Sequence, residues 1–356
     1  MLFLIRAIVS FLYWANHKLR QLSNILVGNM FEPKFDIVLV TGGTLGLGRE
    51  IVKQLVARRA KVVVMDIVLP EDDAKLPGVI YYQCDVSDRA HVFDVQKDIQ
   101  NNVGVVTVLI NNAGISTGKT VLDLSFQEIE RTIQINLISS FYTIKAFLPG
   151  MIFVKRGYIV TIASILGYMS PARLSAYGAS KSGLIALHES LTYELGPPSV
   201  NPHGVKTLLI CPGQIKTGMF TGVKTPHTLL APELEPKFVA AHVIKSIEQG
   251  RRGEMKLPLY GNFVPLFRAM PWPIVELTRK FSGMDESMLH FRNALVKVAS
   301  RVSSLASGVN SVASRSMQSS IRGSKADSPA GSKAPRTSQH SSEHHDRETN
   351  VEIEMH

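Results

Sequence analysis

Six short apolar runs, separated by longer stretches of helical character, constrain the fold of this chain most strongly. Strands that alternate with helices are typical of a parallel sheet, because a parallel connection needs a crossover. The run 158–162 is apolar at nearly every position, as expected when helices cover both faces of a strand. The sequence therefore predicts an α/β fold with a single doubly wound parallel sheet. The predicted strands are Ile37 to Val40, Val62 to Met65, Val79 to Tyr82, Val106 to Ile110, Tyr158 to Ile162 and Lys206 to Ile210.

A glycine-rich turn follows the first predicted strand and leads into a predicted helix. Gly42, Gly46 and Gly48 occupy this turn. Glycines at these places allow a tight turn, close approach of the backbone to a pyrophosphate, and close packing of the helix on the strand. The N-terminus of the helix would then point at the phosphates. We expect the turn to bind a dinucleotide.

The second predicted strand ends in Asp66, eighteen residues past Gly48. A carboxylate at this place accepts hydrogen bonds from the adenosine ribose and repels a 2′-phosphate. No basic residue follows Asp66 directly, and Leu45 fills a turn position where a basic residue could hold that phosphate. The sequence favours NAD as the cofactor, with NADP as the less favoured alternative.

Six motifs extend this pattern in a fixed order. They are Thr41-Gly42-x-x-x-Gly46-x-Gly48, Asn111-Asn112-Ala113-Gly114, Asn136, Ser164, Tyr177-x-x-x-Lys181 and Pro212-Gly213. Together they resemble the short-chain dehydrogenase/reductase family over about residues 35–250. The resemblance implies a Rossmann domain and a nicotinamide-dependent oxidoreductase that acts on CH–OH groups. Ala163 departs from many members, which have a second serine there, but the reacting serine is kept.

The resemblance also implies which residues contact the cofactor. Asp85 corresponds to the carboxylate that meets the adenine amine, although an exposed turn aspartate is the alternative. Ile215 would reach the nicotinamide carboxamide through backbone groups. The full set of implied cofactor contacts is Thr41, Gly42, Gly46, Leu47, Gly48, Asp66, Asp85, Asn112, Ala113, Gly114, Tyr177, Lys181, Pro212, Gly213, Ile215 and Thr217.

Hydride transfer needs a group that moves a proton on the substrate oxygen. A tyrosine phenol with its usual pKa of about 10 is a poor base at neutral pH. Lys181 lies four residues after Tyr177, on the same face of a predicted helix, so its ammonium can lower the pKa of Tyr177. As the resemblance implies, Tyr177 is the acid/base, Ser164 orients the substrate oxygen, and Asn136 anchors a proton-relay water.

The N-terminal residues 1–30 have the composition of a membrane anchor. They contain Arg6, Lys18 and Arg20 but no acid, and Ala7 to His17 is uncharged and mostly apolar. A spanning helix needs about 20 apolar residues, so this segment either spans with snorkelling ends or lies in the interface. A cleaved signal peptide and a plain buried helix are the alternatives. A signal peptide normally has basic residues ahead of its apolar core, which are missing here.

Residues 283–318 have a periodic apolar pattern in an otherwise serine-rich region. Because the segment has many basic residues and no acid from Ser287 to Ala326, we predict a basic amphipathic helix on an anionic membrane. A coiled-coil dimer and a frayed tail are the alternatives. Residues 319–356 are predicted to be disordered. The apolar positions are Met284, Met288, Phe291, Leu295, Val298, Val302, Leu305, Val309 and Val312.

Charge and composition restrict the partners. The net charge is +10, and residues 301–356 hold seven basic and six acidic residues, so most of the surplus lies in residues 1–300. No nucleic-acid motif accompanies it, and a nearby anionic membrane explains it more simply. Cys84 and Cys211 lack zinc-ligand spacing, and no histidine cluster has it, so we expect no metal.

These observations predict one Rossmann domain over residues 31–282 between the anchor and the C-terminal segments. The narrower likeness, carried by the apolar stretch Pro258 to Val275 and by Gly283-Met284-Asp285-x-Ser287-Met288, is to a membrane-associated branch with retinol dehydrogenases, 17β-hydroxysteroid dehydrogenases and lipid-droplet relatives. It implies an endoplasmic reticulum or lipid-droplet protein that faces the cytosol. The expected pocket residues are Leu166, Tyr168, Met169, Met219 and Phe220.

The expected function is hydride transfer between NAD(H) and an apolar alcohol or ketone, such as a retinoid, a steroid or a long-chain lipid. One alternative is an NADPH-dependent keto-lipid reductase, which Asp66 disfavours. Another is a catalytically idle nucleotide-binding scaffold at a membrane. The scaffold would have no need to keep Asn136, Ser164, Tyr177 and Lys181 together. The expected partners are an apolar small-molecule or lipid substrate and a membrane, and no nucleic acid. A homodimer is the alternative that goes with the coiled-coil interpretation of residues 283–318.

Overall fold

The computed structural model describes residues 31–196, 203–220, 223 and 232–288. The predicted N-terminal anchor, the predicted tail and residues 289–318 of the predicted amphipathic helix lie outside them. The strands are β1 (Ile37–Thr41), β2 (Lys61–Asp66), β3 (Val79–Gln83), β4 (Val108–Asn111), β5 (Gly157–Ile162), β6 (Val205–Pro212) and β7 (Gly253–Leu257). The helices are α2 (Gly46–Ala57), α3 (Arg89–Asn102), α4 (Phe126–Ile133), α5 (Ser139–Phe153), α6 (Ser175–Glu194), α7 (Pro236–Glu248), α8 (Val264–Phe267) and α9 (Trp272–Ser282).

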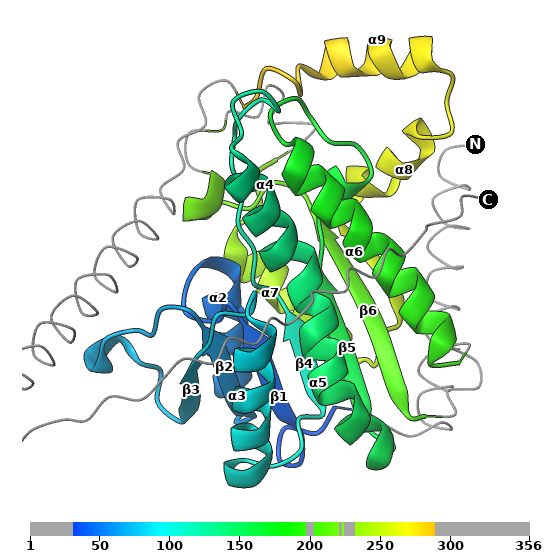
Figure 1. Ribbon diagram of the computed structural model, residues 1–356. Coiled ribbons are helices and arrows are strands. Elements are labelled where there is room, and N and C mark those ends of the chain that lie inside the picture. Colours follow the sequence, from blue (N-terminus) through cyan, green and yellow to red (C-terminus); the bar gives the residue numbers. More distant parts are fainter. Residues whose placement is uncertain (1–30, 197–202, 221–222, 224–231, 289–356) are drawn as a thin grey trace, which may run out of the picture. The chain divides into compact units, whose positions relative to one another are not determined.

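The strands form one parallel sheet in the order β3-β2-β1-β4-β5-β6-β7 (Figure 1). This confirms the predicted doubly wound Rossmann fold and all six predicted strands. The seventh strand, β7, escaped the sequence analysis because Glu254 and Lys256 interrupt its apolar pattern. It lies at the sheet edge, where these two side chains form an ion pair with each other.

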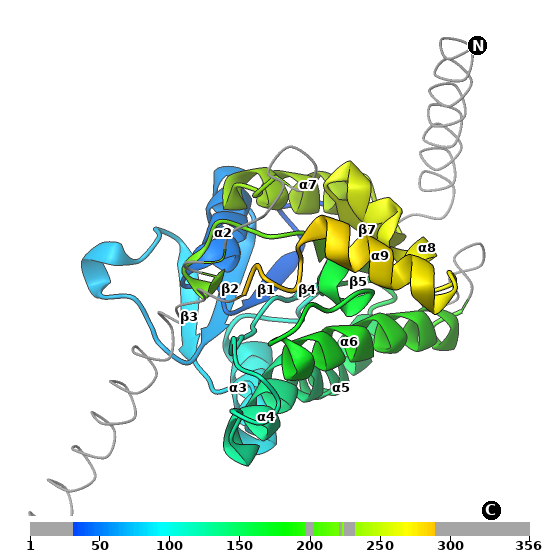
Figure 2. The same cartoon turned by 90° about the horizontal axis from the view of Figure 1, so that it is seen from above.

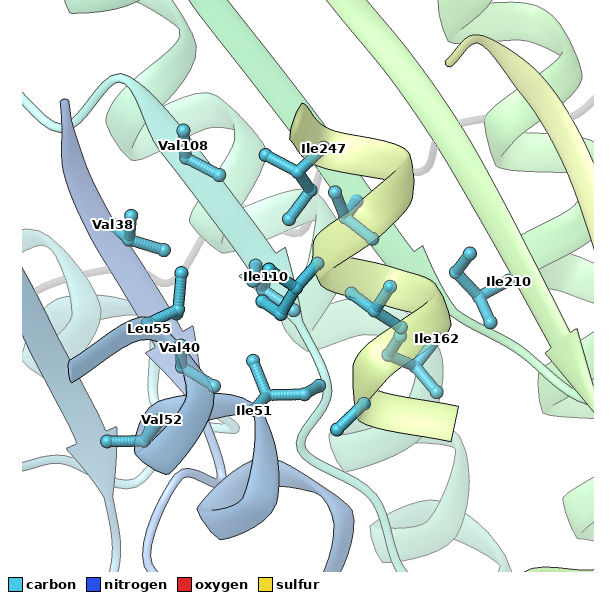
Figure 3. Close-up of a cluster of buried hydrophobic side chains, with 14 of the residues drawn as sticks. Val38, Val40, Ile51, Val52, Leu55, Val108, Ile110, Ile162, Ile210 and Ile247 are labelled. Carbon is cyan, nitrogen blue, oxygen red and sulfur yellow. The ribbon is translucent and has the colours of Figure 1, made fainter. Parts of the chain in front are cut away.

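Two helical layers bury the two faces of the sheet. Helices α2 and α7 cover one face, and α3, α5 and α6 cover the other, as the view from above shows (Figure 2). Neighbouring residues of β1 point to opposite cores: Val38 and Val40 pack with the first layer and Leu39 with the second. Figure 3 shows the first core, where Ile51 and Leu55 of α2 meet the strands. Apolar residues on both faces of the central strands therefore anchor the sheet beneath the site.

The stretch from α4 to α5 combines an ordinary helix start with an irregular middle. Ser125 caps α4 in a capping box with Glu128. A single π-helical turn, Gln134–Ile138, then widens the helix before α5, and such turns are frequent at functional sites. The stretch 126–153 is long and apolar enough to cross a membrane, but half of its most apolar window is buried, as in a core helix.

Strand order reverses direction between β1 and β4, the two strands from which the chain winds outward. In such sheets, ligands bind outside the carboxyl ends of the strands at this place. The glycine-rich turn follows β1 and the Asn112 segment follows β4. The fold thus brings the sequence-predicted residues to one edge of the sheet.

Candidate active site

The glycine-rich turn packs so closely that it has no room for side chains. A Cβ atom on Gly48 would lie 2.0 Å from the Gly42 carbonyl oxygen and 2.6 Å from Asn112 Nδ2. Gly42 and Gly46 have φ values of +65° and +53°, which favour glycine. Leu47 is buried behind the turn. Gly46 and Gly48 therefore leave the backbone at the start of α2 without side chains, which suits close approach of a phosphate group.

Thr41 and Asn112 tie the end of β1 to the end of β4. The N–H groups of Asn112 and Ala113 donate to Thr41 Oγ1 at 3.0 and 3.1 Å. In return, Asn112 Nδ2 donates to the carbonyls of Thr41 and Gly42, both at 3.0 Å. These hydrogen bonds hold the two strand ends at the switch point in a fixed relation.

Asp66 lies at the end of β2, beside the same turn. The N–H and hydroxyl of Thr44 donate to its Oδ2 at 3.0 and 2.6 Å. Arg49, which the sequence analysis did not weigh, donates to the carbonyls of Thr44 and Ala74 at 3.4 and 2.9 Å. The carboxylate is thus held at the turn, with one guanidinium nearby.

Asp85 follows β3 and makes most of its contacts within its own turn. The N–H and hydroxyl of Ser87 donate to its Oδ1 at 2.9 and 2.6 Å, and Arg131 pairs with its Oδ2 at 3.4 Å. Burial alone would raise the pKa of Asp85. The hydrogen bonds from Ser87 and the charge of Arg131 outweigh that effect and lower the pKa.

The segment after β6 returns toward the glycine-rich turn. A Cβ on Gly46 would lie 3.4 Å from Thr217 Cγ2, so Thr217 lies next to the turn. Gly213 N–H donates to the Leu257 carbonyl at 2.6 Å, and Ile215 forms an isolated bridge with Leu234. Backbone hydrogen bonds to β7 and to Leu234 thus position this segment.

Ser164, Tyr177 and Lys181 come together at the ends of β5 and α6. All three are buried. Ser164 Oγ donates to the Pro212 carbonyl at 3.4 Å and accepts from Leu166 N–H at 3.1 Å. Lys181 Nζ lies 5.7 Å from the centre of the Tyr177 ring.

Asn136 completes this group from the π-helical turn. Its side chain accepts from the Ile115 N–H at 2.7 Å and donates to the Ile115 carbonyl at 2.9 Å and to Ser180 Oγ at 3.1 Å. Ser180 in turn donates to the Tyr177 carbonyl at 2.6 Å. A Cβ on Gly114 would lie 3.3 Å from Asn136 Oδ1 and 3.7 Å from Lys181 Nζ. Gly114 therefore keeps open a narrow space between these two side chains.

The pKa of Tyr177 moves against the expected direction. Burial raises it to about 12, and a hydrogen bond with Ser164 only partly offsets this rise. Burial lowers the pKa of Lys181 to about 8. The position of Lys181 explains why it does not lower the pKa of Tyr177 as expected. Its ammonium donates to the Ile162 carbonyl at 2.9 Å, and within the described residues no hydrogen bond joins it to the phenol.

Apolar side chains pack around Tyr177. Of the five expected pocket residues, Leu166 and Phe220 pack in this cluster. Tyr168 points elsewhere, because its hydroxyl donates to Glu254 at β7. The sequence analysis missed Leu174, Val223 and Met288, which join the cluster. Only a folded chain brings Met288 to a tyrosine 111 positions earlier in the sequence.

The structure corrects the predicted start of the C-terminal helix. Helix α9 ends at Ser282, Gly283 has φ +60°, and residues 283–288 form turns. Met288 is buried beside Tyr177 rather than on a membrane-facing helix. The spacing of four between Met284 and Met288 therefore does not mark a helix here, and the packed domain extends beyond residue 282.

The titratable residues of the described part form no group of three or more that would hold a metal ion. Cys84 and Cys211 are free, buried thiols. Burial raises the pKa of both, to about 12 for Cys84.

Known proteins resemble this chain in sequence and in fold. The family model for short chain dehydrogenases matches residues 36–227. An uncharacterized oxidoreductase of Saccharomyces cerevisiae is 40% identical over 251 residues, covering 69% of this chain and 82% of its own. Short-chain dehydrogenase/reductase family 16C member 6 of Bos taurus is 37% identical (72% and 83%), and human retinol dehydrogenase 10 is 32% identical (72% and 84%).

Among solved structures, the aldohexose dehydrogenase of Thermoplasma acidophilum superposes with a TM-score of 0.54 at 25% identity, covering 62% of this chain and 92% of that one. A short-chain dehydrogenase of Streptomyces avermitilis gives a TM-score of 0.56 at 23% identity (69% and 95%), which supports the fold alone. The matched region contains the switch point, the glycine-rich turn and the Ser164–Tyr177–Lys181 group. The chain therefore belongs to the short-chain dehydrogenase/reductase family and is an oxidoreductase that uses a nicotinamide cofactor.

Proposed function

We propose that this protein is a membrane-associated, NAD-dependent dehydrogenase that interconverts an apolar secondary or primary alcohol with its carbonyl compound. One observation carries the proposal. The glycine-rich turn and the Asn112–Gly114 segment, here called the cradle, lie beside a buried Ser164–Tyr177–Lys181 group, and Tyr177 also packs in an apolar cluster. A polar reaction centre next to apolar walls suits a substrate with a single hydroxyl or carbonyl on a hydrocarbon body. Because one relative is a retinol dehydrogenase, retinol is the first substrate to test.

The residues at the cradle fit a nicotinamide dinucleotide. Bare glycine backbone at the N-terminus of α2 suits the pyrophosphate, and the space beside Gly114 lies next to Lys181 and Asn136. The bound dinucleotide would supply the hydride acceptor or donor. Asp66 would bind the adenosine ribose hydroxyls, and its charge would disfavour a 2′-phosphate. Asp85 would face the adenine, and residues 212–217 would close over the nicotinamide end.

Tyr177 would move the proton that accompanies the hydride. With a pKa of about 12 it is protonated at neutral pH, so it can donate its phenolic proton to a carbonyl oxygen during reduction. Oxidation needs the reverse transfer, from the substrate hydroxyl to the Tyr177 oxygen. For that step the Lys181 ammonium must leave the Ile162 carbonyl and face the phenol, where its charge stabilises the phenolate.

Ser164 and Asn136 would position the reacting groups. Ser164 Oγ is held by the Leu166 N–H, which follows β5, and by the Pro212 carbonyl at the end of β6. It can form a hydrogen bond with the substrate oxygen next to Tyr177. Asn136 bonds both backbone groups of Ile115 and also Ser180, so it locks the loop after β4 to α6. We propose that it anchors the water that relays the proton from Lys181 toward solvent.

Exposed apolar side chains on the outer helices support association with a membrane. They lie on α8, α9 and the turns around them, at the end of the molecule that carries the candidate site (Figure 1). A contiguous exposed apolar surface commonly marks a membrane or protein contact. Together with the apolar N-terminal sequence, it favours a lipid surface, at the endoplasmic reticulum or a lipid droplet. The exposed residues are Leu259, Phe263, Leu266, Met270, Trp272, Ile274, Leu277 and Phe281.

The reaction is tested with full-length protein in detergent micelles, NAD or NADP, and a panel of retinol, a hydroxysteroid and a long-chain alcohol. NADH formation with one or more of them is expected, and Tyr177→Phe should abolish it. Tyr193→Phe is the matched control, since Tyr193 is an exposed tyrosine of the same helix. Bound NADH without turnover of any alcohol or carbonyl in either direction would favour the idle scaffold instead.

Membrane association is tested by carbonate extraction of four variants. Deletion of residues 1–28 together with Trp272→Glu and Phe281→Glu should release the protein, and either change alone should release less. Phe153→Glu, which alters an exposed phenylalanine at the end of α5, should leave the protein in the pellet. A combined variant that still pellets while binding NAD would contradict the proposed membrane surface.

A further inference from the structure

The chain that follows α9 returns across the candidate site. Residues 279–288, here called the strap, comprise the last turn of α9 and the turns that follow it. Figure 2 shows this orange segment passing over the carboxyl end of the sheet on its way back from α9. The left-handed conformation of Gly283 turns the chain at the end of the helix.

A clasp of charged and backbone groups fixes the strap to the loop before α6. Arg279 donates from Nε to Asp285 Oδ2 at 3.1 Å, and its Nη2 pairs with Asp285 Oδ1 at 2.5 Å. Both terminal nitrogens of Arg279 also donate to the Ser170 carbonyl at 3.1 Å. The Ala172 N–H donates to Asp285 Oδ1 at 2.8 Å. The fork geometry of arginine suits such a two-sided contact.

The clasped loop leads directly to the catalytic helix. Ser170 Oγ donates to the Leu174 carbonyl at 3.1 Å, and a Cβ on Gly178 would lie 2.2 Å from that oxygen. Tyr177 and Gly178 both lie in the first turn of α6. The loop and the helix start are therefore in contact, so the position of the strap is set relative to Tyr177.

The strap ends with Met288 against the tyrosine ring. Met288 is 2% exposed and packs with Leu174 and Tyr177, and Leu166 and Val223 border the same cluster. Phe220 meets the Tyr177 ring edge to face at 5.7 Å between ring centres. Met288 and Phe220 thus pack directly on Tyr177, whose ring also lies 5.7 Å from Lys181 Nζ.

We infer that the strap is the outer wall of the substrate pocket and that Met288 limits the size of the group that the pocket accepts beside Tyr177. This inference rests on the proposed function, because it assigns a substrate to the apolar side of Tyr177. Methionine is unbranched and flexible, so it can change rotamer to admit a hydrocarbon body while still sealing the site from water. The clasp holds the wall in place while the methionine side chain adapts.

The placement of the strap can be tested without any turnover. In Met288→Cys, the new thiol should react with a neutral maleimide about 10-fold or more slowly than the thiol of Met270→Cys, since Met270 is exposed. The two native cysteines add little background, because both are buried. Adding Asp285→Asn to Met288→Cys keeps the side-chain shape but removes the charge that faces Arg279. It should speed labelling about 2- to 5-fold.

The size limit is tested with alcohols that differ only in the bulk next to the carbinol carbon. Met288→Ala should raise the ratio of kcat/KM for the bulkiest alcohol to that for the smallest about 10-fold or more, since three side-chain atoms leave the wall. Met270→Ala removes the same atoms from an exposed methionine outside the strap and should leave the ratio unchanged. Cofactor-induced thermal shifts confirm that both variants fold.

The results separate the inference from the proposed function. Equal labelling of the two engineered thiols would overturn the placement of the strap, whatever the enzyme catalyses. Turnover by the wild type with an unchanged size ratio in Met288→Ala would overturn the size limit and leave the function standing. Absence of any turnover by the wild type would overturn the proposed function and, with it, the assignment of the apolar side to a substrate.

Discussion

The cofactor side and the substrate side of this site are built in different ways. On the cofactor side, between β1 and β4, the contacts are made by backbone groups, glycines and short polar side chains such as Thr41 and Asn112. On the substrate side, large apolar side chains from four separate segments meet around Tyr177. Backbone geometry tolerates little change, whereas an apolar wall can be repacked. We therefore expect replacements to be tolerated less well on the cofactor side than on the substrate side.

Lys181 lies at the boundary of the two sides, and its replacement should have the largest effect on catalysis. We expect Lys181→Met to lower kcat/KM by about 100- to 10,000-fold, at least as much as Ser164→Ala. In the proposed mechanism Lys181 provides both the charge for Tyr177 and a cofactor contact, whereas Ser164 provides one substrate contact. Steady-state kinetics of the two variants with the same alcohol measure this. A smaller loss of kcat/KM for Lys181→Met than for Ser164→Ala would mean that Lys181 has one of these two roles and not both.

The burial of Lys181 should also appear in the stability of the cofactor-free protein. Burial lowers its pKa to about 8 in the folded chain, against about 10.4 when unfolded. Between these values the unfolded chain holds more protons, so stability should rise with pH, by up to about 3 kcal/mol. Urea unfolding between about pH 7.5 and 9.5 should show a smaller rise for Lys181→Met. Lys206, whose pKa burial also lowers to about 8, is present in both proteins and cancels.

The sequence predicted that the glycine-rich turn, Asp66 and Asn112 lie together, because the signals for this arrangement are local. The glycine-rich turn, Asp66 and Asn112 each follow a strongly apolar strand, and parallel strands bring their carboxyl ends to one edge. The group Ser164, Tyr177 and Lys181 was found in the same way, from a strand end and one helix face. What the sequence did not predict was the direction of the Tyr177 pKa, which depends on burial and on where the Lys181 ammonium points.

The substrate side was predicted only in part because its contacts join distant segments. Leu166 and Phe220 follow β5 and β6, so their nearness to the site was foreseeable. The spacing of four between Met284 and Met288 is typical of helices, so the sequence predicts a helix there. The same spacing is equally compatible with the turns that residues 283–288 form. Strand β7 was missed because Glu254 and Lys256 interrupt its apolar pattern. These charged residues are tolerated there because they pair with each other at an edge of the sheet.

Paired glycine replacements should sharpen the comparison between the two sides. Gly48→Ala places a methyl group 2.0 Å from the Gly42 carbonyl, so we expect a loss of about 1–3 kcal/mol in stability and of measurable NADH binding. Gly218 lies near Phe220 on the substrate side, where a Cβ would meet nothing within 4 Å, and Gly218→Ala should change neither. Denaturation curves and NADH fluorescence titrations measure both. Equal sensitivity at the two glycines would mean that the substrate side is as closely packed as the cradle.

The smallest effect is expected at Asp66, where charge and hydrogen bonding can be separated. Asp66→Asn keeps an oxygen for the Thr44 N–H and hydroxyl but removes the charge that repels a 2′-phosphate. Asp66→Ala also releases Thr44 and loses the ribose contact. We expect both variants to relax the rejection of NADP by about 1–2 kcal/mol, and only Asp66→Ala to weaken NAD binding as well.

Dissociation constants for NADH and NADPH, measured for the wild type and both variants, separate the effect of the Asp66 charge from that of its hydrogen bonds. The wild type should prefer NADH, and the preference should shrink in Asp66→Asn with the affinity for NADH nearly retained. Tighter binding of NADPH by the wild type would instead assign Arg49, whose guanidinium lies beside Thr44, to the 2′-phosphate. In that case the Arg49 guanidinium and not the Asp66 carboxylate would set the choice of cofactor. A long side chain would then decide the chemistry of the cofactor side, as large side chains do on the substrate side.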